Sequence, residues 1–425
     1  FPVCRCSCDR PFIPFRKPVK IMLLRDIVKQ VQHLEMKLMA GEAGLNNEVV
    51  WTHMVDSDTV SAFLQGQELV FTTGLGLSGT LTLRRLVEEV WRNRASGIVI
   101  NIGPYIQEIG QDVLDFANEK GFPVFQVPWK IRMAEIMRII CFSVIKEQQK
   151  AVEMTAALNN AFLCPRQEEL YVSSFLQNGY LADSRYTAVN IRVYADGNRV
   201  TGERLAQLSA GIDRHLRCGG ASVLCCTQER QIVLVFCDRS VEEQLAVLRE
   251  LTHSLGTQLR TSETAHLCQS RTSTGIRCLH ESYSFGEKMA DLMAACTIPG
   301  EQTFERVRLL AYSALGIYRV LLTLPSKEAA EEYLRDTVLP LYEYDALNHS
   351  DLIAVLQCYL RHDCSVKDTA QELVVHRNTV NYKLGKAAEV LGKDLSGFDI
   401  RFQLHLGFLL YPMVYPNGFC AGAQK

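Results

Sequence analysis

The chain has 425 residues, which at about 150 residues per domain corresponds to two or three domains. Hydrophobic residues make up 48% and charged residues 22%, and the formal net charge is -2, which excludes a uniformly basic nucleic-acid coat but not a local basic patch. No stretch approaches the roughly 18 consecutive apolar residues of a membrane span, so no membrane partner is expected. The 15 scattered cysteines are too few for a disulfide scaffold and favour reduced thiols and a cytoplasmic location.

Residues 1–20 contain four prolines and no periodic pattern, so we predict a disordered N-terminal tail there, with Met22 as a candidate translation start. Cys4, Cys6 and Cys8 form the one close group of cysteines in the sequence. Their spacing is too tight for the usual zinc sites and no companion ligand follows, so no metal site is expected.

Residues 21–130 alternate between strand-like and helical patterns, as α/β domains do. The apolar runs at 68–72, 97–101 and 124–127 predict buried strands. Between the first two, Leu81–Ala95 has the spacing of an amphipathic helix. We therefore predict an α/β sensor-type domain over this segment.

Residues 131–163 contain neither proline nor glycine, and their apolar positions recur at helical spacing, which predicts one long helical linker. The apolar seam runs from Met133 to Phe162. This apolar seam has to be covered. Either the helix pairs with a second copy or bridges domains, or the seam packs within one chain, and the pattern favours the two alternatives equally.

Residues 164–300 predict an α+β domain in which strands and helices follow the order β-α-β-β-α-β. From Phe304 onward the pattern is almost wholly helical, with Pro325 and Pro340 as interruptions. We therefore predict an all-α C-terminal domain over 301–413, followed by a tail over 414–425.

The stretch 365–392 has the pattern of a helix-turn-helix. Ser365 is a good N-cap, and Val366, Ala370 and Leu373 line one face of a short helix. A second helix follows, with a buried stripe predicted at Val380, Leu384, Ala387 and Leu391. Ala370 is small at the point where two helices joined by a tight turn approach closely.

The opposite face of the second helix is polar and basic, with three basic and no acidic residues between Arg377 and Lys386. Arg and Asn side chains can read base edges in the major groove, and Lys can neutralise phosphates. The pattern therefore favours DNA binding, and the alternative is a solvated helix pair in an ordinary bundle. The DNA-binding residues that we predict are His376, Arg377, Asn378, Thr379, Asn381, Tyr382, Lys383 and Lys386.

The segment Val375–Leu384 resembles the C-terminal helix-turn-helix of PucR-type bacterial transcriptional regulators. Upstream, 50–53, 66–74 and 121–128 resemble the N-terminal domain of that family, and the middle segment resembles its degenerate GGDEF-like module. The resemblance implies a multi-domain fold with an α/β sensor domain, a GGDEF-like middle domain and a helical DNA-binding domain.

The resemblance also implies a function. It points to a regulator that binds double-stranded promoter DNA as a homodimer or higher homo-oligomer and responds to a small-molecule effector of purine or other nitrogen-compound catabolism. No catalytic residue and no cofactor is expected. Arg377, Asn378 and Asn381 would read bases, while Thr379, Tyr382, Lys383 and Lys386 would contact phosphates.

The sequence departs from the family pattern at positions that matter for the DNA-binding helices. Asn381 and Lys383 stand where many relatives carry Arg. Val374 occupies a turn position that is often Gly, and Gly385 lies inside the second helix, where Gly costs about 1 kcal/mol of helix propensity relative to Ala.

Gly74–Gly79 forms a G-x-G-x-x-G pattern between a predicted strand and a predicted helix. A nucleotide-binding enzyme is therefore the alternative function, but the next strand ends in Asn101 rather than in the acidic residue that binds ribose hydroxyls. A loop of this kind can also hold a small anion through its backbone N–H groups. The effector-binding residues that we predict are Glu68, Thr72, Thr73, Gly74 and Asn101.

The middle domain lacks the residues of a diguanylate cyclase. Its predicted hairpin tip, Thr227–Gln231, has no glycine and one carboxylate, so the ligands for two-metal phosphoryl chemistry are missing. We expect this module to transmit or dimerise rather than to catalyse.

Overall fold

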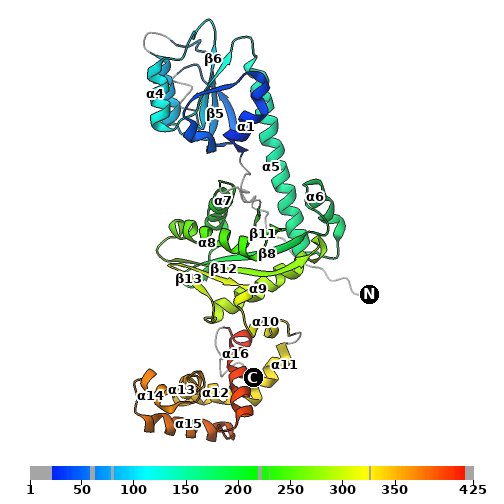
Figure 1. The fold of residues 1–425 in the computed structure, drawn as a ribbon, viewed down its shortest axis with the longest axis vertical. Helices are drawn as coiled ribbons and strands as arrows, with labels where there is room; N and C mark the ends of the chain where they lie inside the picture. Colours follow the sequence, from blue (N-terminus) through cyan, green and yellow to red (C-terminus); the bar gives the residue numbers. More distant parts are fainter. Residues whose placement is uncertain are drawn as a thin grey trace, which may run out of the picture. The chain divides into compact units, whose positions relative to one another are not determined.

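The computed structural model describes residues 22–57, 63–77, 81–218, 223–228, 230–324 and 327–416. The predicted tail 1–20 and the last nine residues lie outside these ranges. The chain forms two compact units, one of residues up to 160 with 169–179, and the other of 161–168 with 180 onward (Figure 1). No helix within the described ranges is long and apolar enough to cross a membrane.

The first unit is built on a five-stranded sheet with the order β2-β7-β6-β5-β4, in which β4, β5, β6 and β7 run parallel and β2 runs antiparallel to β7. A small β1–β3 pair stands beside it. The elements are β1 (Met22–Leu23), α1 (Leu24–Val31), β2 (Lys37–Ala40), β3 (Glu48–Val49), β4 (Trp51–Met54), β5 (Glu68–Thr72), α3 (Leu83–Arg92), β6 (Gly97–Ile102), α4 (Gln111–Lys120), β7 (Val124–Pro128), α5 (Met133–Leu163) and α6 (Val172–Gln177).

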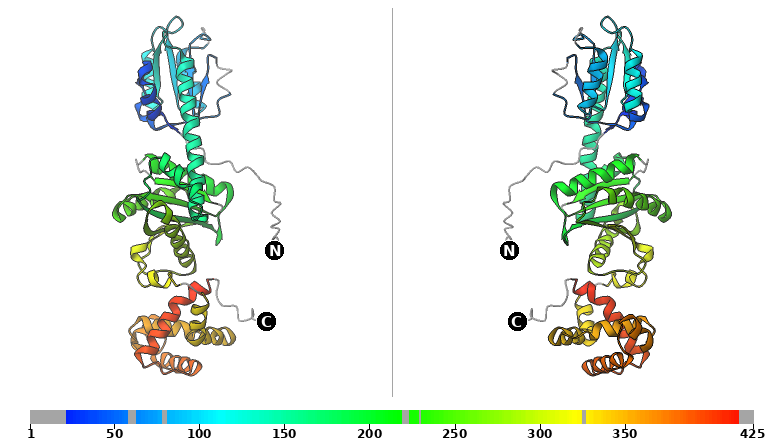
Figure 2. Two further views of the ribbon diagram at one scale, coloured as in Figure 1. Left: turned by 90° about the vertical axis from the view of Figure 1, so that its right-hand side faces the viewer. Right: turned by 90° about the vertical axis from the view of Figure 1, so that its left-hand side faces the viewer.

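Both faces of this sheet are covered, which is why its central strands are continuously apolar rather than alternating. Val70 and Ile98 pack with α3 and α4 on one face, while Phe71 and Val99 pack with α1 and α5 on the other. Figure 2 shows α5 running along its face of the sheet. The predicted α/β domain and its three strands are confirmed.

The predicted long helix is also confirmed, as α5. Its N-terminal half packs inside the first unit, because Met133, Ile136, Ile140 and Val144 belong to the same buried cluster as the sheet. For this half of the seam, packing within one chain is the correct alternative. Farther along, Phe162 stacks on Tyr283 of the second unit, to which residues 161–163 belong.

The second unit begins with a seven-stranded sheet whose main path is β10-β11-β8-β12-β14-β13, with β9 paired to β8. The predicted order β-α-β-β-α-β holds for its main elements, with the short β9 added after the first strand. They are β8 (Arg185–Ala195), β9 (Asn198–Arg199), α7 (Gly202–Cys218), β10 (Val223–Gln228), β11 (Gln231–Cys237), α8 (Val241–Gln258), β12 (Glu263–Thr274), α9 (Leu279–Ala295), β13 (Gln302–Phe304) and β14 (Val307–Ala311).

The prediction of an almost wholly helical chain from Phe304 onward is wrong for β14, which pairs in parallel with β12. Val307 and Leu309 are buried in the core that α7 and α8 form with the sheet, and Leu310 is buried on the α9 side. A five-residue segment with four apolar residues is ambiguous between strand and helix, and here pairing with the edge of β12 favours the strand.

The remaining elements are helices: α10 (Tyr318–Leu321), α11 (Lys327–Asp336), α12 (Leu339–Asn348), α13 (Leu352–Arg361), α14 (Val366–Glu372), α15 (Arg377–Leu391) and α16 (Phe398–Val414). Leu334, Leu341, Leu356, Ala387 and Leu404 of these helices share one buried cluster. This confirms the helical C-terminal region.

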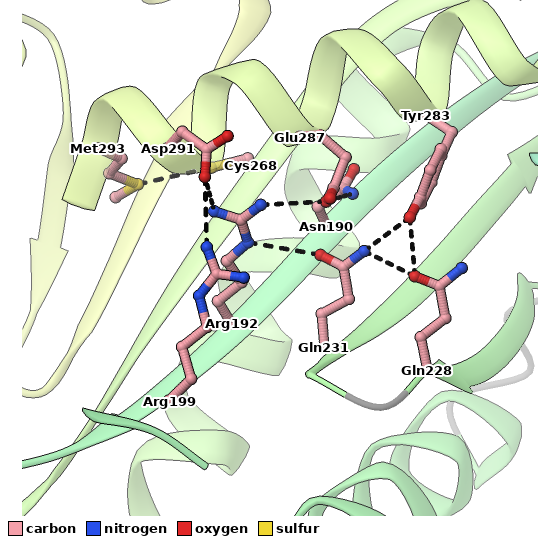
Figure 3. A network of polar contacts seen from close by, with 10 residues as sticks. All are labelled: Asn190, Arg192, Arg199, Gln228, Gln231, Cys268, Tyr283, Glu287, Asp291 and Met293. Atoms are coloured by element: carbon pink, nitrogen blue, oxygen red, sulfur yellow. Dashed lines mark hydrogen bonds and ion pairs between the residues drawn. The ribbon is translucent and has the colours of Figure 1, made fainter. Parts of the chain in front are cut away.

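A polar network joins α9 to the sheet (Figure 3). Arg192 of β8 is almost completely buried and forms ion pairs with Asp291 at 2.6 Å and Glu287 at 3.3 Å. Farther along the same side of α9, the Tyr283 hydroxyl accepts a hydrogen bond from the Gln231 side-chain amide at 3.0 Å. Burial raises the pKa of Tyr283 to about 12, so its hydroxyl stays protonated.

We expect Arg192→Ala to lower the free energy of unfolding of the second unit by about 3 kcal/mol, because it removes a large, fully buried side chain, leaves a cavity and takes a hydrogen-bond donor away from the buried Gln231. Arg199→Ala is the matched control, because it removes a more exposed arginine from the same Asp291. It should lower the free energy of unfolding by less than about 1 kcal/mol.

Urea unfolding followed by far-ultraviolet circular dichroism measures this difference. The three tryptophans, Trp51, Trp91 and Trp129, all lie in the first unit, so their fluorescence reports its unfolding and should not change. Equal losses in the two variants would contradict the role assigned to Arg192.

Candidate nucleic-acid interface

The helix-turn-helix is formed by α14 and α15, which meet over a small apolar cluster. Val355 of α13, Ala370 of α14 and Val380 of α15 are buried together. The Ala370 methyl group allows the two helices to approach closely. Because Val380 faces inward, the helical period turns residues 378, 381 and 382 outward, while Arg377 is exposed as the first residue of α15.

Both helices begin with a side-chain cap. The Ser365 hydroxyl accepts a hydrogen bond from the Asp368 N–H at 3.2 Å, which confirms the predicted N-cap of α14. His376 caps α15, since its Nδ1 accepts from the Asn378 N–H at 3.2 Å. The structure therefore places His376 at the start of α15 as a capping residue.

Arg377, Asn378, Asn381 and Tyr382 form the exposed face of α15. The phenol of Tyr382 is 74% exposed. None of these four side chains has a hydrogen-bond or ion-pair partner within the part of the chain that the structure describes. Their donors are therefore available to a ligand that approaches this face.

The two lysines are held by carboxylates of the same unit. Lys383 lies 2.6 Å from Asp351, the N-cap residue of α13, and Lys386 lies 3.0 Å from Glu389 one turn along α15. Hydrogen bonding to Glu389 raises the pKa of Lys386. Thr379 is half-buried. Of the eight predicted DNA-binding residues, four thus have exposed side chains without a partner in the described ranges, and one caps α15. Two are lysines held in ion pairs, and one is a half-buried threonine.

The turn between the two helices is strained at Val374. Its φ is +52°, a left-handed conformation that a β-branched residue rarely adopts, and its side chain is 89% exposed. Valine therefore contributes strain here without contributing packing. The predicted departure from the usual glycine has a direct structural cost.

Gly385 leaves no break in the second helix, because α15 runs without interruption from Arg377 to Leu391. An added Cβ at Gly385 would meet nothing within 4 Å. The glycine is therefore not required for packing within this chain.

The predicted effector residues lie at two opposite edges of the N-terminal sheet. Thr72, Thr73 and Gly74 follow the carboxyl end of β5, and Asn101 lies near the carboxyl end of β6. Glu68 is the first residue of β5, about 13 Å away at the amino edge. The structure therefore does not bring Glu68 together with the other four residues.

The loop after β5 already binds an anion, the carboxylate of Asp56. The N–H groups of Thr73 and Gly74 donate to Asp56 Oδ1 at 2.8 and 3.1 Å, and the Thr72 hydroxyl donates to the same oxygen at 2.8 Å. Asn101 instead donates from Nδ2 to the carbonyls of Val127 and Pro128. In the described part of this loop, the N–H groups of Thr73 and Gly74 therefore donate to Asp56.

A pocket of about 380 Å³ opens at the same carboxyl edge. Ile106 lines it and also packs against Gly74, whose φ of +78° and lack of a Cβ allow this contact. The polar side chains of the pocket come from the starts of α3 and α4 and from the loop after β6: Thr82, Arg84, Tyr105, Gln107, Glu108 and Asp112. The sequence-based prediction does not include this set, because its members come from the loop after β6 and from the starts of two helices, which only the folded domain brings together.

Family models match both ends of the chain. The model of the purine catabolism regulatory protein-like family matches residues 26–144, and the model of the PucR C-terminal helix-turn-helix domain matches residues 352–410. The second match covers α14 and α15 and confirms the helix-turn-helix.

Several curated proteins are similar to parts of the chain. The proline-responsive transcriptional activator PutR of Bacillus subtilis is 35% identical over 99 residues, which are 23% of this chain and 24% of PutR. The purine catabolism regulatory protein of the same organism is 27% identical over 27% of this chain and 22% of its own length. The transcriptional activator AdeR, also of B. subtilis, is 21% identical over 58% of this chain and 56% of AdeR. The chain thus spans about a quarter to about half of these relatives.

We expect Val374→Gly to raise the free energy of unfolding of the second unit by about 0.5–1 kcal/mol, because glycine removes the left-handed strain and nothing packed is lost. Val320→Gly is the matched control. Val320 is 60% exposed in α10 and has ordinary helical φ, so glycine there should destabilise by a similar amount.

Urea unfolding followed by circular dichroism compares the two variants. Destabilisation by Val374→Gly as large as that by Val320→Gly would mean that the turn is not strained.

Proposed function

We propose that this chain, which belongs to the PucR-type transcriptional regulators by its N-terminal and C-terminal domains, binds double-stranded promoter DNA through α14 and α15. The observation that carries the proposal is the exposed face of α15, where Arg377, Asn378 and Asn381 have no partner within the described ranges. In helix-turn-helix proteins the second helix enters the major groove with its N-terminal residues on base edges.

We assign base reading to Arg377, Asn378 and Asn381. Arginine can donate two hydrogen bonds to guanine, and asparagine can pair with adenine in the same bidentate manner. These side chains lie on the first two turns of α15, where contact with the groove floor is expected.

Phosphate contacts are assigned to Thr379, Tyr382, Lys383 and Lys386. Lys383 and Lys386 would exchange Asp351 and Glu389 for phosphate oxygens. Because both ion pairs are accessible to water, their loss costs little compared with the gain from counterion release. His376 would act through the N-terminus of α15, which it caps.

We further propose that the protein acts as a homodimer or higher homo-oligomer, with two recognition helices about 34 Å or a multiple of that distance apart. Exposed apolar side chains on α5 support pairing with a second copy. Phe142 is 66% exposed, Ile145 45% and Val152 41%. The domain built on β8–β12 is proposed to be the degenerate GGDEF-like module, which transmits or dimerises.

The N-terminal domain is proposed to bind a small metabolite at the carboxyl edge of its sheet, in the pocket beside Gly74. In open α/β sheets, ligands bind outside the carboxyl ends of the strands. Two relatives are named for proline response and for purine catabolism, which supports an effector from the catabolism of nitrogen compounds. We propose a cytoplasmic location and no catalytic activity.

The alternative of a nucleotide-binding enzyme is weaker. Asp56 uses the N–H groups of Thr73 and Gly74 that would have to bind a pyrophosphate. The strand that follows ends near Asn101, whose side chain amide donates to two backbone carbonyls. Within the described ranges, these contacts favour a structural role for the glycine-rich loop.

We expect Arg377→Ala to weaken binding to a duplex selected from random sequence by about 1–3 kcal/mol, with a smaller loss on unselected DNA. Lys386→Ala should weaken both duplexes equally and reduce the slope of log affinity against log salt concentration by about one. Lys327→Ala removes a positive charge from α11 and serves as the matched control. Salt-titrated gel-shift measurements provide all three comparisons.

Equal losses on selected and unselected DNA for Arg377→Ala would remove its base-reading role. No retardation of any duplex at low salt would refute DNA binding itself.

We expect one compound from a panel of proline and purine bases to raise the melting temperature of the first unit, read by tryptophan fluorescence. Gln107→Ala, in the pocket wall, should abolish the shift, and Thr73→Ala should reduce it by removing the hydrogen bonds of the Thr73 hydroxyl to Asp56. Lys130→Ala, on the same domain but outside the lining, is the control. A shift that survives both substitutions would place the effector elsewhere.

A further inference from the structure

One side-chain cluster in the second unit is not used by the DNA-binding face. Cys358 lies in the last turn of α13, and His362, four residues later, is the C-cap residue of the same helix. Glu372 is the last residue of α14. The sulfur of Cys358, a ring nitrogen of His362 and a carboxylate oxygen of Glu372 all lie within 4.8 Å of one another.

The chemistry of these three groups suits a zinc ion. Zinc binds thiolate sulfur at about 2.3 Å, imidazole nitrogen at about 2.0–2.1 Å and carboxylate oxygen at about 2.0–2.2 Å, usually in a tetrahedron. Ligand atoms around such an ion are therefore about 3.5 Å apart. His362 Nε2 and Glu372 Oε2 are now hydrogen-bonded at 2.5 Å, so they would have to separate by about 1 Å.

The surroundings allow this rearrangement. Glu372 is exposed and His362 is half-buried, so both side chains have room to adjust. Arg361 Nη2 also donates to Glu372 at 2.9 Å, but its side chain is 62% exposed and can release the carboxylate to solvent. Cys358 is fully buried, so its position in the cluster is the most constrained of the three.

We propose that Cys358, His362 and Glu372 form a zinc site that fastens α13 to α14. The ion replaces the thiol proton of Cys358, which leaves to solvent, and it replaces the hydrogen bond between His362 and Glu372. No electron is transferred. Three protein ligands leave one position for water, and the ion ties the first helix of the helix-turn-helix to the helix that supports it.

The consequence is a C-terminal region whose stability depends on zinc. A ligand that binds only the folded state stabilises it in proportion to the logarithm of its concentration over Kd. This proposal does not rest on DNA binding, so the two can fail separately.

The test uses the full chain with Cys4, Cys6 and Cys8 changed to Ser, so that the N-terminal cysteines cannot contribute. After chelator treatment the protein is titrated with Co²⁺ and then with Zn²⁺. We expect one equivalent of cobalt to produce a thiolate-to-cobalt charge-transfer absorption, which zinc then abolishes. Zinc should also raise the melting temperature of the second unit, followed by circular dichroism, without changing the tryptophan transition of the first unit.

Three variants assign the site. His362→Gln and Cys358→Ser should weaken cobalt binding more than tenfold, and Cys358→Ser should also remove the charge-transfer band. Cys364→Ser is the matched control, because this half-buried cysteine lies near α13 but outside the cluster, and the variant should bind as the parent does. His362→Gln keeps the test valid if Cys358→Ser unfolds, because His362 is only half-buried.

No charge-transfer band in the parent, or a band that His362→Gln leaves undiminished, would overturn the proposal. A variant that loses metal binding but still binds DNA would show that the zinc site is not needed for DNA binding. A variant that loses DNA binding alone would not contradict the zinc site.

Discussion

The close approach of α14 and α15 over Ala370 and Val380 is the constraint on which the candidate interface depends. A larger side chain at Ala370 would push the helices apart, and Val380 fixes the rotation of α15 about its own axis. That rotation decides which residues face solvent, because a helix turns by a fixed angle per residue. The outward position of Asn378 and Asn381 is thus set from inside the domain by two small apolar side chains.

The polar contacts of the interface follow from the same arrangement. Lys383 is close to the supporting helix α13, where Asp351 neutralises it, and Lys386 reaches back to Glu389. Both lysines are thereby kept near the edge of the exposed face rather than dispersed in solvent. Exposed ion pairs contribute at most about 1 kcal/mol, so little free energy is lost when either lysine leaves its carboxylate partner.

Local patterns predicted the elements well, because caps and apolar periodicity act over a few residues. Ser365 as N-cap and Val380 as a buried position are both present in the structure. Contacts between distant segments were not predictable from such patterns. The ion pair of Lys383 with Asp351 joins residues 32 apart, and Asp56 meets Gly74 through strands whose pairing the sequence does not state. The separation of Glu68 from the other predicted effector residues is different in kind, since the length of a five-residue strand already separates it from Thr72.

The carboxylate of Asp56 in the loop after β5 has a consequence for what the N-terminal domain can discriminate. An intramolecular ligand held by the fold acts at an effective concentration of millimolar or more, and free phosphate or simple organic acids compete with it poorly. In the structure, Asp56 thus occupies the two N–H groups that an external anion would need. If the proposed effector binds at this edge of the sheet, selectivity depends on pocket side chains such as Gln107 and Tyr105, which distinguish metabolites by shape and hydrogen bonding rather than by charge alone.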